Sequence, residues 1–334
     1  MTVSNRAAIR KTAGGTMTAS QLAGLGMLNP EQSQQFIRFM TDDAVLLQQV
    51  TTRTMKEQTA NIDYFAVGGR QMRAGTERVV PLAAGPFGSF TRKQLVALEA
   101  VLPVDITFNF VEDNLEKENG EEMIVQEIAR LVSNDTEDLG LHGDITLPAL
   151  ITDTDSNGYD DNTGLTQNDH TFLSQNEGWF PMARSLSLSG KVALNAVPAS
   201  VSDWKDIVFP AMLGNMPEKY KRNVNGLVFL VSPTTEEQYR QSLQSRNTIL
   251  GDAAVTQQIA VEYMGIPVLK VPYITDARDV MLTNTKNLVY GIYRQIRVGR
   301  FVNERERQVE YTVSLRNDFQ ITNDALMVVT THGL

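Results

Sequence analysis

The chain has 334 residues, no cysteine and a formal net charge of −9 at pH 7. A chain of this length can bury a substantial core unaided, and the lack of cysteine excludes disulfides, thiolate metal sites and cysteine nucleophiles. The acidic balance argues against a general nucleic-acid-binding protein, because Lys and Arg dominate affinity for phosphates. There is no run of about 18 apolar residues and no apolar segment near the N-terminus, so we expect neither a membrane span nor a secretory signal.

The N-terminal part predicts an arm followed by short helices. Residues 1–28 are rich in Thr, Ala, Ser and Gly and show no period, which favours an extended, weakly structured arm. The Asn-Pro-Glu sequence at 29–31 is typical of a helix start. A Thr-Asp-Asp turn at 41–43 then precedes apolar residues at helical spacing over 44–50, which predicts a second amphipathic helix.

A long β-hairpin with a Gly/Pro-rich middle is predicted between residues 62 and 110. The alternation of apolar and polar residues breaks at Gly68-Gly69, passes a Gly/Pro loop at 84–88, and resumes towards residue 110. An isolated hairpin is marginal in water, so we expect this one to lie on another subunit. Its charged residues are candidates for inter-subunit ion pairs, with a solvated hairpin tip as the alternative: Arg70, Arg73, Glu77 and Arg78.

The strongest helix signal covers residues 113–139. Ile124, Ile128 and Leu131 form one apolar stripe among charged residues. A helix of this length spans roughly 30–40 Å, and Gly140 predicts its end.

The remaining chain mixes loops, helices and strands. Residues 143–181 contain few apolar positions and many turn-forming residues, which predicts an exposed loop. A helix over 201–220, interrupted near Pro210 and Pro217, and a helix over 234–244 follow. Strands are predicted at 226–231, 268–271, 280–282, 288–293, 296–300, 307–316 and 325–331. The chain is therefore expected to be α+β.

Catalytic motifs are lacking in the sequence. The three histidines, His142, His170 and His332, do not lie at metal-ligand spacing, and no nucleophile elbow, dinucleotide loop or phosphate loop occurs. Paired acids fall in the first turns of predicted helices, where they complement the helix dipole. We therefore expect a protein that is not an enzyme.

One acidic segment follows the spacing of a calcium-binding loop. Gly158 would permit its sharp turn, but Gly164 stands where a bidentate Glu is usual, so a solvated acidic turn is the alternative. No cofactor is expected, and calcium is the alternative. The candidate ligands are Asp153, Asp155, Asn157, Asp161 and the backbone carbonyl of Tyr159.

The order of these parts resembles the tailed-bacteriophage major capsid proteins with the Hong Kong 97-type fold, which encapsulins share. Residues 68–77 look like the extended loop of that family, and 101–106 look like its return strand. The acidic step at 111–114 resembles the entry into the spine helix. Residues 265–268 and 287–292 are similar to steps in the axial domain and back to the peripheral domain.

The resemblance covers about residues 30–334 and implies the fold and its domains. The implied parts are an N-terminal arm with short helices (1–60), the extended loop (61–104), the peripheral domain with spine helix 113–139 and acidic loop 143–181 (105–221), the axial domain (222–290) and C-terminal strands of the peripheral domain (291–334).

The resemblance also implies a function without catalysis. Pentamers and hexamers of the chain would form an icosahedral head that encloses double-stranded DNA without sequence-specific binding. Scaffolding, portal and decoration proteins are the implied partners besides the chain itself. The implied location is the virion, assembled in the host cytoplasm, with no membrane contact.

In some family members a loop lysine joins an asparagine of a neighbouring subunit. Lys93 is the only lysine in this loop and is expected at an inter-subunit contact, but the partner asparagine and the assisting acid are not identifiable. Two other functions stay open. One is an encapsulin-like compartment shell, and the other is a calcium-dependent secreted hydrolase or adhesin, suggested by residues 153–161 and the absence of cysteine.

Overall fold

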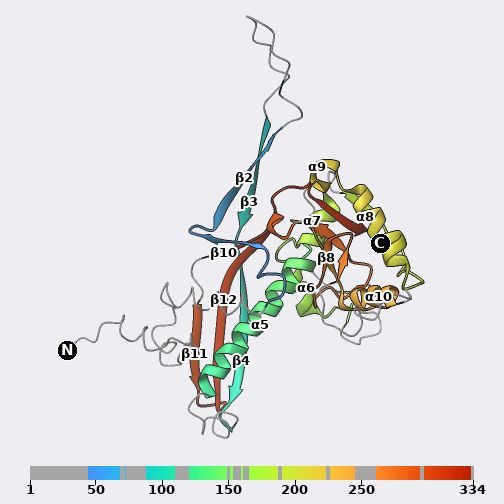
Figure 1. Ribbon diagram of the computed structural model, residues 1–334. Coiled ribbons are helices and arrows are strands. Elements are labelled where there is room, and N and C mark those ends of the chain that lie inside the picture. Colours follow the sequence, from blue (N-terminus) through green and yellow to red (C-terminus); the bar gives the residue numbers. More distant parts are fainter. Residues whose placement is uncertain are drawn as a thin grey trace, which may run out of the picture.

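The structure is a computed structural model that describes the chain from residue 44 to residue 331 with gaps. The described residues are 44–67, 72, 88–109, 120–148, 151–152, 159–160, 165–186, 190–222, 226–244, 261–293 and 297–331. The predicted arm, the tip of the hairpin and the first residues of the predicted spine helix lie outside them. Two large cores and a projecting hairpin make up the described part (Figure 1).

A five-stranded sheet holds the first core. Its strands are β1 (Thr51–Met55), β10 (Leu288–Tyr293), β12 (Gln308–Ile321) and β11 (Arg297–Asn303), in that order, with β4 (Leu98–Thr107) also paired to β12. Only β1 runs parallel to its partner among these pairs. Along β12 every second residue is buried, because alternate side chains point to opposite faces.

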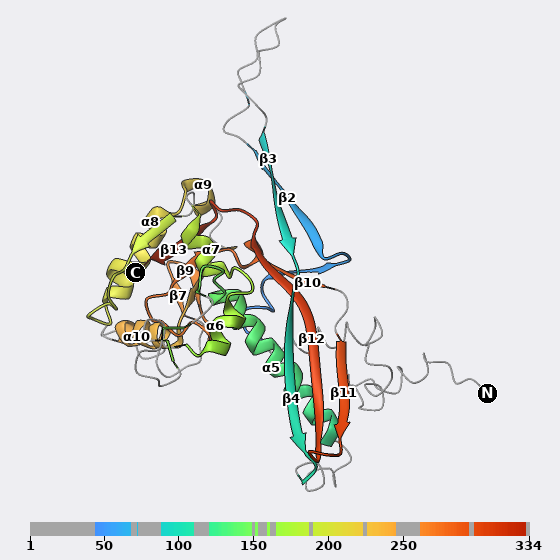
Figure 2. The same cartoon turned by 180° about the vertical axis from the view of Figure 1, so that it is seen from behind.

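The spine helix α5 (Gly120–His142) covers one face of this sheet, as Figures 1 and 2 show from opposite sides. Its Ile128, Val132 and Leu139 belong to the same buried cluster as the inward residues of β12. The helix runs two residues past Gly140, so the predicted end was wrong. A Cβ at Gly140 would lie 2.7 Å from Cε1 of Phe319. The glycine therefore makes room for the aromatic ring and does not terminate the helix.

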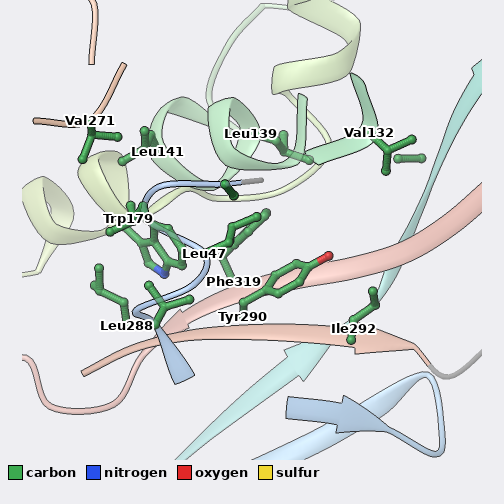
Figure 3. Close-up of a cluster of buried hydrophobic side chains, with 14 of the residues drawn as sticks. Leu47, Val132, Leu139, Leu141, Trp179, Val271, Leu288, Tyr290, Ile292 and Phe319 are labelled. Carbon is green, nitrogen blue, oxygen red and sulfur yellow. The ribbon is translucent and has the colours of Figure 1, made fainter. Parts of the chain in front are cut away.

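The described parts of the segment 143–181 do not form the exposed loop that its composition predicted. They include α6 (Gln167–Leu173) and the start of α7 (Trp179–Ser185), and Trp179 is fully buried. The ring of Phe319 lies between those of Trp179 and Tyr290, at centroid distances of 5.2 and 5.5 Å (Figure 3). A few large side chains bury the described part of this segment. Because they are few, the composition of the segment did not predict that it is buried.

A six-stranded sheet holds the second core. Its order is β5 (Gly190–Ala193), β13 (Met327–Thr331), β9 (Met281–Thr283), β6 (Val228–Val231), β8 (Ile266–Lys270) and β7 (Glu262–Tyr263). The helix α10 (Pro233–Gln244) packs with it through Tyr239, whose ring meets that of Phe209 edge-on at 5.1 Å. Most predicted strands of the C-terminal half are confirmed, whereas β1 and β5 were not predicted. The α+β class is confirmed.

Two predicted helices differ from the structure. Residues 44–50 form turns, although Leu46 and Leu47 are buried as an amphipathic helix would require. The helix predicted over 201–220 is a π-helix (Trp204–Val208), α8 (Phe209–Asn215) and α9 (Glu218–Lys221). Pro210 stands in the first turn of α8, directly after the π-helix, and does not interrupt the helical path, whereas Pro217 separates α8 from α9.

Candidate interaction surface

The strands β2 (Thr59–Val67) and β3 (Gly88–Val96) form an antiparallel hairpin that projects from the body (Figure 1). They pair with each other and with no third strand among the described residues. The predicted return strand at 101–106 is not part of it, because these residues lie in β4 and pair with β12. Alternate side chains give the hairpin two faces of different chemistry.

The outward face of the hairpin carries an aromatic pair, in which Phe90 is exposed and Phe65 is half-buried. Phe65 and Phe90 are cross-strand neighbours with ring centroids 4.5 Å apart, and Phe90 is 80% exposed. Next to them, Nε of Arg92 donates to Oδ1 of Asp63 at 2.7 Å, and this hydrogen bond holds the pKa of Asp63 below its usual value. An exposed ion pair adds little stability, but an aromatic pair with a charged border suits a protein partner.

The inward face of the hairpin is engaged with the same chain. Ile62 and Leu95 are buried in a small cluster with Met55, Ala97 and Val289. The ammonium group of Lys93 forms an ion pair with Asp324, and the two side chains are only 14% and 20% exposed. The side chain predicted to reach a neighbour is thus bound within its own subunit. Its inter-subunit role, and that of Arg70, Arg73, Glu77 and Arg78, which lie outside the described residues, stays a prediction.

A second exposed surface lies on the five-stranded sheet, on the face opposite α5 (Figure 2). Val101 and Pro103 of β4 and Phe301 of β11 are exposed there, Val101 by 55% and Phe301 by 63%. The cross-strand ion pair between Arg316 and Glu99, at 3.1 Å, lies at one border. The register places Glu310, Thr312 and Ser314 of β12 between β4 and β11 on this face, so the surface mixes apolar and polar side chains, as protein–protein interfaces commonly do. We call Val101, Pro103 and Phe301 the sheet patch.

The predicted calcium ligands cannot be placed together. Asp153, Asp155, Asn157 and Asp161 lie outside the described residues, and the calcium site stays a prediction. Tyr159 is described and forms an antiparallel bridge with Thr166. Asp160, which the sequence did not single out, is buried: its Oδ2 accepts the Thr152 N–H at 3.2 Å and lies 3.4 Å from Nε2 of His170. This carboxylate therefore links Thr152, before the acidic segment, to His170, after it.

The other histidine in the described ranges has a structural contact as well. Nδ1 of His142 lies 2.8 Å from Oδ1 of Asp138, one turn earlier on α5. Within the described ranges no three or more His, Cys, Asp or Glu side chains come together as a metal site would need. In the same ranges no helix is long and apolar enough to span a membrane.

Comparison with known proteins finds similarity to capsid proteins. No protein-family model matches the chain. The putative prophage capsid protein YqbE of Bacillus subtilis is 27% identical over 294 residues, which cover 84% of this chain and 85% of that protein.

Solved structures of shells share the fold. A chain of the satellite phage P4 procapsid, solved with the size determination (Sid) protein, matches with a TM-score of 0.67 and 15% identity over 98% of this chain and 97% of that one. The capsid of the empty GTA particle matches with a TM-score of 0.54 and 13% identity, over 87% of this chain and 90% of that one. The virus-like particle from Pyrococcus furiosus matches with a TM-score of 0.51 and 11% identity, over 89% of this chain and 96% of that one. The chain thus has the Hong Kong 97-type capsid fold, and its resemblance to the tailed-bacteriophage major capsid proteins is confirmed.

Proposed function

We propose that the chain is the major capsid subunit of a phage-type particle and that its copies assemble into a closed icosahedral shell. The observation that carries this proposal is the projecting hairpin. It pairs with no third described strand, and its outward face presents the ring of Phe90, packed on the half-buried Phe65, to solvent. A two-stranded sheet with an exposed aromatic ring is marginal alone and gains stability on a second protein surface.

The sheet patch is the surface that suits this hairpin on a neighbouring copy. Both surfaces combine exposed aromatic or aliphatic side chains with one exposed cross-strand ion pair, Asp63–Arg92 on the hairpin and Glu99–Arg316 beside the patch. The two surfaces lie on different elements, so contact between them is heterologous. Heterologous contacts repeated around an axis close into rings, and rings of such subunits can close a shell.

The finer parts of the function follow from the capsid fold and the charge. We place the subunit in pentamers and hexamers of a virion head assembled in the host cytoplasm, with scaffolding, portal and decoration proteins as partners. A net charge of −9 suits a wall that encloses double-stranded DNA without adhering to it. The role is structural and not enzymatic.

Electron microscopy of the purified full-length chain tests the proposal. We expect closed polyhedral particles of uniform size, and light scattering should show a mass far above that of a 37.1 kDa subunit. A chain that stays monomeric across protein and salt concentrations would overturn it. Particles from producing cells that carry nuclease-resistant DNA support a phage head, whereas particles filled with a protein cargo support the compartment shell.

A further inference from the structure

The corner between β12 and β13 gathers contacts from parts of the chain that are far apart in sequence. Asn323 and Asp324 stand in this corner, where the chain passes from the five-stranded to the six-stranded sheet. Asn323 is linked to Tyr64 of the hairpin, 259 residues away, and to Tyr220 of α9, 103 residues away. The corner therefore connects three structural units.

Asn323 is held in one orientation. Its Oδ1 accepts the backbone N–H of Ala325 at 3.1 Å, which turns its Nδ2 towards the two tyrosines. That Nδ2 donates to the hydroxyl of Tyr64 at 2.9 Å and to the hydroxyl of Tyr220 at 2.6 Å. An amide nitrogen has two N–H groups, so these two bonds use both.

The backbone of Asn323 is fixed as well. Asn287, which is buried, accepts the N–H of Asn323 through Oδ1 at 2.8 Å and donates from Nδ2 to its carbonyl at 3.0 Å. These two hydrogen bonds with Asn287 hold the corner in place when either tyrosine moves. A displacement of α9 is therefore resisted at the same side chain that holds the hairpin.

Both strands of the hairpin meet this corner on their inward face. Tyr64 of β2 reaches Asn323, and Lys93 of β3 reaches Asp324 in the ion pair described above. Closer to the base, Oδ2 of Asp318 accepts the N–H of Val96 at 2.6 Å. These polar contacts act together with the buried cluster around Ile62 and Leu95 to fix the direction of a hairpin that pairs with no third strand in the described part of the chain.

We infer that the Asn323–Asp324 corner is a joint that couples the direction of the hairpin to the unit around the six-stranded sheet. Tyr220 belongs to that unit, because it packs against the second core. The hydroxyls of Tyr64 and Tyr220 also hydrogen-bond to each other. Movement of this unit would therefore remove the contacts of Tyr220 with Tyr64 and with Asn323 and allow the hairpin to change direction. In a shell, which rests on the proposed function, the joint would set how far each hairpin reaches over its neighbour.

Pulsed electron paramagnetic resonance on full-length subunits tests the joint. The chain has no cysteine, so the exposed Ser89 on the hairpin and the exposed Gln241 on α10 can be replaced by cysteine and spin-labelled without background. We expect one narrow distance distribution in the otherwise unchanged chain. Tyr220→Phe removes one hydroxyl outside the hairpin and should raise the population of other hairpin directions about fivefold, the equivalent of one hydrogen bond.

Matched variants separate the joint from general loosening. Lys93→Met removes the ion pair to the corner and should broaden the distribution, whereas Arg92→Met removes the exposed pair on the opposite face and should not. Amide exchange should show that the β2–β3 hydrogen bonds persist in every variant.

Three results would each overturn the joint: an unchanged distribution in Tyr220→Phe, equal broadening in Arg92→Met, or a melted hairpin in the corner variants. The measurement is made on subunits below the concentration of assembly. Failure to form shells would therefore refute the proposed function without changing the result for the joint.

Discussion

The side chain of Glu137 accepts the backbone N–H of Leu46 through Oε1 at 3.3 Å, although 91 positions separate the two residues. Glu137 is 1% exposed on α5, and Leu46 lies in the turns that precede β1. The bond fastens the first described residues of the chain to the spine helix. Burial raises the pKa of Glu137 to about 7, against the opposing effect of hydrogen bonds from the Leu46 and Val45 backbone.

This carboxyl makes stability depend on pH. Its pKa is higher in the folded than in the unfolded chain, so the folded chain binds more protons between about pH 4.5 and pH 7. The resulting stabilisation is fully present below pH 4.5 and is lost as the pH rises through 7. Glu137→Gln keeps an acceptor oxygen and cannot ionise. At pH 8 we expect it to raise the free energy of unfolding by about 1–3 kcal/mol.

Chemical denaturation at pH 5 and pH 8 checks this expectation. Glu127→Gln, on the exposed side of the same helix, is the control and should follow the unchanged chain. Burial also raises the pKa of Asp318, to about 6. In both variants the free energy of unfolding therefore keeps a smaller pH dependence of the same sign. Equal pH dependence in Glu137→Gln and the unchanged chain would contradict the assignment.

Gly143 and Gly214 should respond in opposite ways to alanine. A Cβ at Gly143 would lie 2.4 Å from the Asn176 carbonyl oxygen and 2.6 Å from that of Leu139, and backbone atoms cannot yield without shifting α5. We expect Gly143→Ala to lower the free energy of unfolding by about 2–3 kcal/mol. A Cβ at Gly214 in α8 would have no atom within 4 Å. Gly214→Ala should therefore raise the free energy of unfolding by about 0.5–1 kcal/mol. Urea unfolding midpoints measure both, and similar midpoints for the two variants would refute the packing argument.

The sequence predicted the fold best where local patterns coincide with burial. β10 and α10 agree with their predictions to within about one residue, because runs of apolar residues and a Ser-Pro helix start are local signals. Gly140 was misread because a glycine that ends a helix and one that admits an aromatic ring look alike in sequence. The ring belongs to Phe319, which lies far along the chain.

The candidate surfaces were only partly predictable. Alternation indicated a hairpin, but the pairing of Phe65 with Phe90 depends on a turn whose register no local signal specifies. The intramolecular partner of Lys93 escaped prediction because Asp324 lies 231 residues later and has no motif. Long-range side-chain contacts of this kind follow from the tertiary fold and not from neighbouring residues.

The sequence favours a solvated acidic turn over a calcium site in the acidic segment. The Glu expected at the last ligand position is replaced by Gly164, and the carboxylate of Asp160 is engaged with Thr152 and His170. We expect no saturable heat when calcium is titrated calorimetrically into the full chain. A saturable heat that disappears in Asp155→Ala would establish the site instead.

Removal of the outer hairpin should separate folding from assembly. The two large cores contain no residue of β2 or β3, so replacing residues 66–90 by a short turn should leave the thermal unfolding midpoint within a few degrees of the unchanged chain. Assembly should be lost, because the outward face of the hairpin no longer reaches a neighbour. Light scattering and electron microscopy measure this, and normal particles from the shortened chain would show that the hairpin is not the main contact.

A finer test addresses Phe90 alone. Phe90→Ser removes one ring of the aromatic pair without touching the inward face that holds the hairpin to Asp324 and Asp318. Aromatic anchors at interfaces are worth about 2 kcal/mol or more, so the protein concentration needed for assembly should rise at least about tenfold. Ser89→Ala on the neighbouring position is the matched control and should assemble normally. If both variants assemble at the same concentration as the unchanged chain, the outward face is solvated in the shell and the neighbouring subunit contacts the hairpin elsewhere.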